Sequence, residues 1–191
     1  KYPWLDTVGI RATSNHPHRA DSEGRDGGIS DPMEQNGQEI KVRRFLRTGR
    51  WLDGGTEVDI MTSCEQTIQR TARTSLRRAL ELARRFESLS RGRSPLMQAT
   101  ALRSFGRLCH QIGRHRVALK AYTAARRLMR TDRVTRARID RMLIDIHMYL
   151  GQFRKARNAA RRALAVFEFL SMEADLAQTQ VNYANLLHRQ D

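Results

Sequence analysis

The sequence predicts an all-α protein in which antiparallel helix pairs repeat and stack into an α-solenoid, preceded by a disordered N-terminal segment. Three observations lead to this prediction. A pattern of apolar and small residues recurs with a period of 38–40 residues, which is typical of a stacked helical array. After residue 62 the only proline is Pro95, so little interrupts a helical chain. Apolar residues in this part fall mostly three or four positions apart, which is the spacing of one helix face.

Residues 1–62 are predicted to be largely disordered or to form a linker. Residues 1–37 hold three of the four prolines and five of the twelve glycines, and residues 14–38 are polar and show no period. Residues 41–51, KVRRFLRTGRW, mix basic and aromatic side chains and leave two interpretations open. One is a nucleic-acid contact. The other is a short element that packs Phe45, Leu46 and Trp51 against the next domain.

The helical repeat domain is predicted over residues 63–191, which make up the rest of the sequence. Thr62 and Glu65 have the spacing of a capping box, and one apolar stripe continues from there to Phe86. Ser94 and Pro95 then suit the N-cap and the first position of the next helix. We expect breaks between helices near residues 91–94, 113–115, 130–132, 151–152 and 171–173.

Each copy of the repeat combines a glycine turn with small residues on the helix that follows. In the first copy these positions are held by Gly106, Gly113, Ala118, Tyr122 and Ala125. Thirty-eight residues later they are held by Ile144, Gly151, Ala156, Ala160 and Ala163. The glycines at the turn end the first helix of each pair, because glycine accepts a left-handed cap. Small side chains on the second helix allow the two helices to approach closely.

Residues 104–125, SFGRLCHQIGRHRVALKAYTAA, and residues 149–164, YLGQFRKARNAARRAL, resemble the tetratricopeptide repeat (TPR) family. The resemblance covers about residues 95–191 and extends more loosely over 63–90. It implies helix pairs whose first helices line a concave groove, and a protein that acts by binding other proteins.

A narrower resemblance is carried by AARRALAVFEFL at residues 159–170 and LAQTQVNYANLLHRQD at residues 176–191. These segments are similar to the repeat arms of bacterial proteins with a C-terminal CHAT domain, a caspase-like peptidase domain. None of that domain is found in these 191 residues, so its chemistry is not carried over to this chain.

Sequence motifs of catalysis are missing, and we predict a chain that is not an enzyme and has no cofactor. No phosphate-binding loop, His-Glu-x-x-His or Gly-x-Ser-x-Gly pattern occurs. Cys109 and His110 are neighbours, but adjacent side chains on a helix point in different directions, so Cys109 is expected to be a buried structural thiol. The histidines after residue 62 lack a three- or four-residue spacing, and no metal site is predicted. Only two cysteines are present, which fits a reducing compartment, so we expect a cytoplasmic protein. No apolar run approaches the roughly 20 residues that a membrane helix needs, so no membrane segment is expected.

Charge is distributed unevenly along the chain. Residues 1–60 hold 9 Lys/Arg and 10 Asp/Glu, a net charge of −1, while residues 61–191 hold 26 and 10, a net charge of +16. Of the 35 basic residues 31 are arginine, whose planar fork fits carboxylates and phosphates. This charge predicts an acidic partner, with solvated helix surfaces as the plainer interpretation.

The groove implied by the resemblance would be lined from three successive first helices. Its predicted ligand-binding residues are Arg103, Arg107, Arg138, Arg141, Asn182 and Asn185. Arg103 and Arg107 are four positions apart, and Arg138 and Arg141 are three apart, so each pair shares one face of its helix. Four arginines in one groove would favour an acidic peptide, a C-terminal carboxylate or a phosphate.

The sequence therefore predicts a non-enzymatic protein-protein interaction scaffold, the TPR arm of a larger bacterial regulatory or signalling protein. The alternative is binding of nucleic acid or another acidic ligand through the arginine-rich helical surface, although aromatic residues rarely alternate with the basic ones. Self-association is also expected, because the last helix, from about Glu173, would leave apolar residues uncovered. Those residues are Leu176, Val181, Tyr183, Ala184, Leu186 and Leu187.

Overall fold

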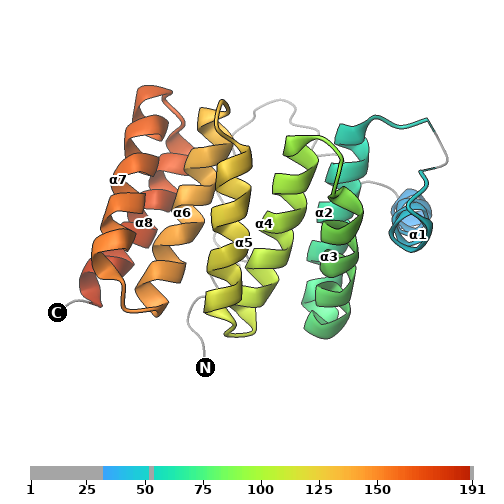
Figure 1. Cartoon of the computed structure of the whole chain (residues 1–191), viewed down its shortest axis with the longest axis horizontal. Coiled ribbons are helices and arrows are strands. Elements are labelled where there is room, and N and C mark those ends of the chain that lie inside the picture. Colours follow the sequence, from blue (N-terminus) through green and yellow to red (C-terminus); the bar gives the residue numbers. More distant parts are fainter. Residues whose placement is uncertain (1–31, 52–53, 190–191) are drawn as a thin grey trace, which may run out of the picture. The chain divides into compact units, whose positions relative to one another are not determined.

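The computed structural model describes residues 32–51 and 54–189, and this part of the chain contains eight α-helices and no β-strand. The helices are α1 (Pro32–Thr48), α2 (Glu57–Thr74), α3 (Leu76–Ser90), α4 (Pro95–Gln111), α5 (His115–Leu128), α6 (Arg133–Tyr149), α7 (Phe153–Phe169) and α8 (Glu173–His188). Figure 1 shows the helix pairs in a row from α2–α3 to α6–α7, with α8 between α6 and α7 and with α1 seen almost end-on beside α2 and α3. The predicted all-α fold of stacked helices is confirmed, while residues 1–31, the first half of the segment predicted to be disordered or a linker, lie outside the described residues.

The helices form antiparallel pairs, α2 with α3, α4 with α5 and α6 with α7, and α8 follows as a further first helix. Each second helix also packs against the first helix of the next pair, and α2 contacts α4 as α6 contacts α8. All five predicted breaks are present. Gly113 and Gly151 have φ angles of 77° and 68° at the turns inside two pairs, which explains why glycine is needed there.

Small residues lie where the two helices of a pair meet. Ala118, Ala125, Ala156 and Ala163 are fully buried. A side chain on Gly106 would place its Cβ 3.3 Å from both Ala121 and the ring of Tyr122. The predicted close approach of the paired helices therefore depends on these alanines and on Gly106.

Replacing Ala118 or Ala156 with leucine should destabilise the protein by about 1–3 kcal/mol, because the added atoms force the helix pair apart. Ala174 is exposed on α8, so Ala174→Leu is the matched control and should change stability by less than about 0.5 kcal/mol. Urea denaturation followed by circular dichroism measures both effects. Unchanged stability in both core variants would contradict this packing.

The repeat domain begins earlier than the predicted residue 63. Helix α2 starts at Glu57 with a capping box between Thr56 and Asp59: the Asp59 amide donates to Thr56 Oγ1 (3.3 Å), and the Thr56 amide donates to Asp59 Oδ2 (2.9 Å). The capping box predicted at Thr62 and Glu65 is wrong, since both residues lie inside α2. The same spacing of hydroxyl and acidic residue occurs six positions earlier, and the helix begins there.

The apolar stripe that predicted one helix up to Phe86 spans two helices. Ser75 is extended, with φ −153° and ψ 101°, and separates α2 from α3. Its Oγ accepts a hydrogen bond from the amide of Arg78 (3.4 Å) and caps α3. Because the apolar spacing continues through Ser75, periodicity alone could not reveal this reversal, which makes α2 and α3 a helix pair like the others.

Helix α1 corrects the prediction of a linker for residues 32–51. Val42, Phe45 and Leu46 are buried in one cluster with residues of α2, α3 and α4. The ring of Trp51 packs edge-on against Phe45, with centroids 5.8 Å apart. Of the two interpretations of residues 41–51, packing against the next domain is confirmed. Burial of the apolar residues of this basic segment against α2 and α3 stabilises it as a helix.

Candidate functional site

All six residues predicted to bind a ligand lie on first helices. Arg103 and Arg107 are on α4, the pair Arg138 and Arg141 is on α6, and Asn182 with Asn185 is on α8. These residues and the carboxylates that they contact lie on the first helices α2, α4, α6 and α8. We call this surface the first-helix face. Its charged and hydrogen-bonding members are Glu65, Arg103, Arg107, Arg138, Arg141, Asp145, Asp175 and Asn182.

Ion pairs connect α2 to α4 and α6 to α8 on this face. Arg103 Nη2 on α4 donates to Glu65 Oε1 on α2 at 2.8 Å. On α6, Arg138 Nη2 and Arg141 Nη1 donate to the two oxygens of Asp175 on α8, at 2.9 and 2.7 Å. The structure therefore brings Arg138 and Arg141 together on one carboxylate, and it holds Arg103 on a separate one.

The sequence interpretation missed the carboxylates that bind these arginines. Glu65 precedes Arg103 by 38 residues and Asp175 follows Arg138 by 37, so the separations match the repeat period. That signal was available, because residues one repeat apart lie on neighbouring first helices. Burial acts to raise the pKa of Asp175. The pKa is nevertheless held below its usual value by the hydrogen bond and charge of Arg138 and by the charge of Arg141.

Asn182 is engaged within the face, whereas Asn185 is not. The Asn182 side-chain amide donates to Asp145 Oδ2 at 3.1 Å and its oxygen accepts from Gln178 at 3.2 Å. Asn185 is exposed, and none of the hydrogen bonds found among the described residues involves its side chain. Ligand binding by the two asparagines stays a prediction, and hydrogen bonds hold only the Asn182 side chain in place.

Arg107 differs from the other three arginines of the face. Its Nη2 is buried and has no hydrogen-bond partner among the described residues. Burial lowers the pKa of Arg107, and the charge of Glu65 partly opposes that shift. Ser104 Oγ and Gln111 Oε1 are likewise buried without a partner among the described residues. Arg107 and Gln111 follow Ser104 by three and seven positions on α4, so the three residues share a side of the helix. Buried polar atoms without partners are uncommon and indicate a place where water or a ligand completes the structure.

Asp145 makes the charge of the face depend on pH. Burial raises the pKa of Asp145 to about 7, and the nearby charge of Arg141 only partly offsets the shift. The carboxyl group is therefore largely neutral below pH 7 and carries a negative charge above it. Acidification through neutrality makes the first-helix face more positive.

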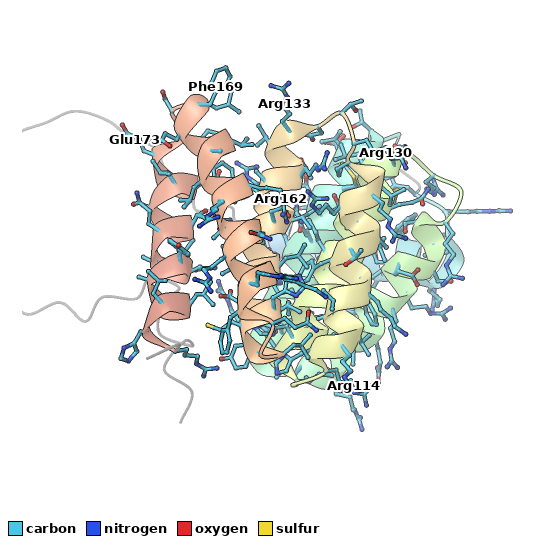
Figure 2. The ribbon with its side chains drawn as sticks, turned by 60° about the vertical axis from the view of Figure 1, so that its left-hand side comes forward. Arg114, Arg130, Arg133, Arg162, Phe169 and Glu173 are labelled. Atoms are coloured by element: carbon cyan, nitrogen blue, oxygen red, sulfur yellow. The ribbon has the colours of Figure 1, made fainter. Side chains whose placement is uncertain are left out.

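A second arginine cluster holds the helices together away from the first-helix face. The Asp140 side chain on α6 is 3% exposed and accepts hydrogen bonds from Arg126 on α5 (2.8 Å) and Arg162 on α7 (2.7 Å). Figure 2 shows Arg162 on the second helix of its pair, beside α6. Asp140 and Asp145, five residues apart on α6, contact different partners.

Two histidines that the sequence interpretation considered scattered are neighbours in the structure. The Nδ1 atoms of His110 and His115 are 3.0 Å apart across the Gly113 turn, and both rings pack against Tyr149. Burial, with the charge of His115, lowers the pKa of His110 to about 4. No group of three or more metal-binding side chains is found in the part of the chain that the structure describes. Cys109, predicted to be a buried thiol, is 1% exposed.

The helix pairs and their face define the class of protein as a helical repeat, and comparison with solved structures identifies the fold as TPR-like. Two structures of a putative kinesin light chain from Podosopora anserina with nearly identical TPR-like repeats, one of them a point variant, are similar to this chain. Their TM-scores are 0.53 for the variant and 0.52 for the other, at 14% identity, and each comparison covers 85% of this chain and 92% of the other. No model of a protein family matches the sequence, and no curated protein matches it. Within the described residues, no helix is long and apolar enough to span a membrane.

Proposed function

We propose that this chain is a non-enzymatic scaffold whose first-helix face binds an acidic segment of a partner protein. The TPR-like fold is one that commonly mediates protein interactions. The observation that supports the acidic partner best is the partnerless, buried Nη2 of Arg107, near Arg103 and on the same face as Arg138 and Arg141. In the cell the scaffold would be cytoplasmic and would serve as the repeat arm of a larger bacterial regulatory protein, as the resemblance to the arms of CHAT-domain proteins implies.

Internal ion pairs position the arginines without using all their hydrogen-bonding capacity. A guanidinium group has five N–H donors, and Arg103 uses one of them on Glu65. Arg141 likewise donates once, to Asp175, and Arg138 donates twice and is 44% exposed. A carboxylate from a ligand could accept the remaining donors from side chains that are already held in place, which lowers the entropic cost of binding.

The charge of the face also favours an acidic ligand. Four arginines face three carboxylates, and one of these, Asp145, is only partly ionised near neutral pH. Two aromatic residues near these charges, Tyr122 and Phe167, are buried and offer no surface on which a base could stack. A peptide carboxylate therefore fits this face better than a nucleic acid.

Self-association is a second candidate property, favoured by the exposed apolar residues at the α7–α8 end. Phe169 is 79% exposed and its ring points away from the helices in Figure 2. Val181 and Leu187 on α8 are 46% and 43% exposed, and Ala184 is exposed between them. Of the residues named for this surface, Leu186 is buried instead. Light scattering tests whether the chain forms dimers or larger species through this surface.

Titration with a fluorescent oligoglutamate peptide tests the acidic-partner proposal. The variant Arg103→Gln/Arg141→Gln should weaken binding by about 2 kcal/mol, which is about 30-fold, because two charge-assisted hydrogen bonds are lost. The variant Glu65→Gln should instead strengthen binding by a few-fold, since it removes the carboxylate that competes for Arg103. A variant that merely disturbs folding cannot strengthen binding.

The matched control is Arg116→Gln/Arg157→Gln, which removes two exposed arginines from the second helices α5 and α7. This control should bind the peptide as tightly as the original chain, apart from a small long-range effect of charge. Equal losses in the control and in Arg103→Gln/Arg141→Gln would show that binding follows net charge, and would overturn the assignment of the first-helix face.

A further inference from the structure

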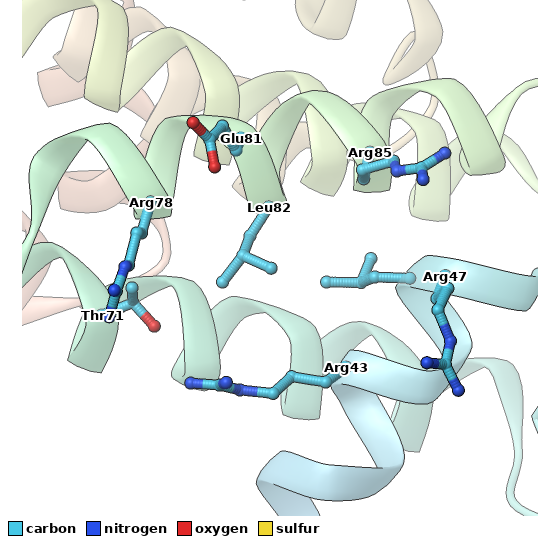
Figure 3. A pocket seen from close by; sticks show the side chains of 8 residues that line it. Arg43, Arg47, Thr71, Arg78, Glu81, Leu82 and Arg85 are labelled. Carbon is cyan, nitrogen blue, oxygen red and sulfur yellow. The ribbon is translucent and has the colours of Figure 1, made fainter.

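A cleft between α1 and the α2–α3 pair collects arginines that the first-helix face does not include. It encloses about 470 Å³ and is drawn in Figure 3. Helices α1, α2 and α3 all contribute to it. Its lining residues are Arg43, Leu46, Arg47, Thr71, Arg78, Glu81, Leu82 and Arg85.

Most of the positive charge in this cleft is not neutralised by internal partners. Arg47, Arg78 and Arg85 make no ion pair with any of the described residues, unlike the arginines at the first-helix face. Arg43 does, through Glu39 at 2.6 Å, and the one acidic lining residue, Glu81, lies 4.0 Å from Arg77 outside the cleft. The cleft thus has a net positive charge that an external anion could neutralise.

The arginines are spread along two walls with leucines between them. Arg43 and Arg47 are four residues apart on α1, and Arg78 and Arg85 are seven apart on α3, so each pair shares one side of its helix. Figure 3 shows Arg78 and Arg43 reaching toward Thr71 at one end, with Leu82 in the middle and Arg47 and Arg85 at the other end.

The middle of the cleft is apolar. Two of its lining residues are leucines, of which Leu46 is buried and Leu82 is half-buried. On α1, Ile40 is 62% exposed and lies three and seven residues before Arg43 and Arg47, which places it on the same side of the helix. An occupant of this cleft therefore meets an apolar strip with basic groups on both sides.

We infer that this cleft binds an acidic amphipathic helix of a partner protein. The leucine side chains of such a helix would contact Leu46 and Leu82, and its flanking carboxylates would pair with the arginines of α1 and α3. This is the helix-in-groove mode of peptide recognition, with electrostatic complementarity at both edges. The cleft shares no residue with the first-helix face, so the inference does not depend on the acidic peptide proposed for that face.

Other anions fit the cleft less well. A single phosphate group needs guanidinium groups that converge on one point, whereas these are distributed along both walls. A single-stranded nucleic acid needs aromatic side chains on which its bases stack, and the lining contains none. Leucines between two rows of arginine match a ligand that carries both carboxylates and apolar side chains.

Fluorescence anisotropy with a helical peptide that has a leucine stripe flanked by glutamates tests the inference on the full chain. The variant Arg78→Glu/Arg85→Glu should weaken binding about tenfold or more, and Arg47→Glu on the opposite wall should weaken it several-fold. The control is Arg154→Glu/Arg161→Glu on α7, which has the same seven-residue spacing and exposed side chains and should leave the affinity within about twofold.

Two further ligands separate the amphipathic helix from other anions. A peptide with the leucines changed to glutamine, at unchanged charge, should bind about tenfold more weakly than the leucine peptide. An oligothymidylate should show no binding that depends on Arg78 and Arg85. Equal affinity for the leucine and glutamine peptides, arginine-dependent binding of the oligothymidylate, or an unchanged affinity in both arginine variants of the cleft would each overturn the inference. Circular dichroism melts of all variants confirm that the fold is retained.

Discussion

Replacing both Arg126 and Arg162 with methionine is expected to destabilise the protein by about 3–5 kcal/mol, because it leaves the Asp140 carboxylate buried without a charged partner. The Asp140 side chain is 3% exposed and accepts hydrogen bonds from both arginines, which come from α5 and α7 on either side of α6. The loss should therefore affect two helix pairs together. Urea denaturation, monitored by circular dichroism, measures the change in the free energy of unfolding.

A third substitution separates the loss of side-chain packing from the effect of leaving the Asp140 charge buried without a partner. Adding Asp140→Asn to the double variant removes the buried charge at nearly constant shape, and should restore more than half of the lost stability. Arg127→Met is the matched control, because Arg127 is exposed on α5 beside Arg126 and should change stability by less than about 0.5 kcal/mol. A double variant that is as stable as the original chain would show that Asp140 is hydrated rather than held by these arginines.

Phe45→Ala is expected to cost about 3–5 kcal/mol at the attachment of α1, because it leaves a cavity where a fully buried ring contacts α2 and α3. The ring also loses its edge contact with Trp51 and the guanidinium of Arg93, which lies 5.8 Å from its centroid. In a repeat protein such a loss stays local, so α1 should open while the later helices remain folded.

Limited trypsin digestion reports this opening directly, since α1 contains three arginines, Arg43, Arg44 and Arg47. Cleavage at these sites should become much faster in Phe45→Ala, while cleavage within α4–α7 should not change. Ile40→Ala, which removes an apolar side chain that is 62% exposed on the same helix, should be cleaved like the original chain. Equal cleavage of α1 in the Phe45 variant and the original chain would contradict the packing described for this helix.

The parts of the fold that could be predicted from sequence are those that repeat. Gly113 and Gly151 end first helices at equivalent positions, and Ala118 and Ala156 pack at equivalent helix crossings, so each copy supports the interpretation of the other. Helix α1 has no second copy, so the repeat gave no support for the packing of Phe45 and Leu46 over the alternative of a linker. Ser75 reverses the chain without glycine or proline, and no turn signal of the kind found at Gly113 accompanies it.

For the candidate site, the sequence predicted the arginines but not the carboxylates that they contact. Placing Arg103 and Arg141 on first helices required only the helical period, whereas pairing them with Glu65 and Asp175 required knowing which helices are neighbours. The cleft between α1 and α3 depends on how a non-repeating helix docks, and the repeat pattern carries no information about that contact. The pairing of His110 with His115 depends in the same way on the sharp turn at Gly113.

The proposal that acidic segments bind the first-helix face is tested most directly by following the Nε–Hε signals of the arginine side chains by NMR during titration with the oligoglutamate peptide. The largest shifts are expected for Arg103, Arg107, Arg138 and Arg141, with Arg107 changing most because its buried guanidinium group gains its missing partner. Exposed arginines of the second helices, such as Arg116 and Arg157, should change little. Uniform shifts over all exposed arginines, with Arg107 unchanged at saturation, would contradict the proposal.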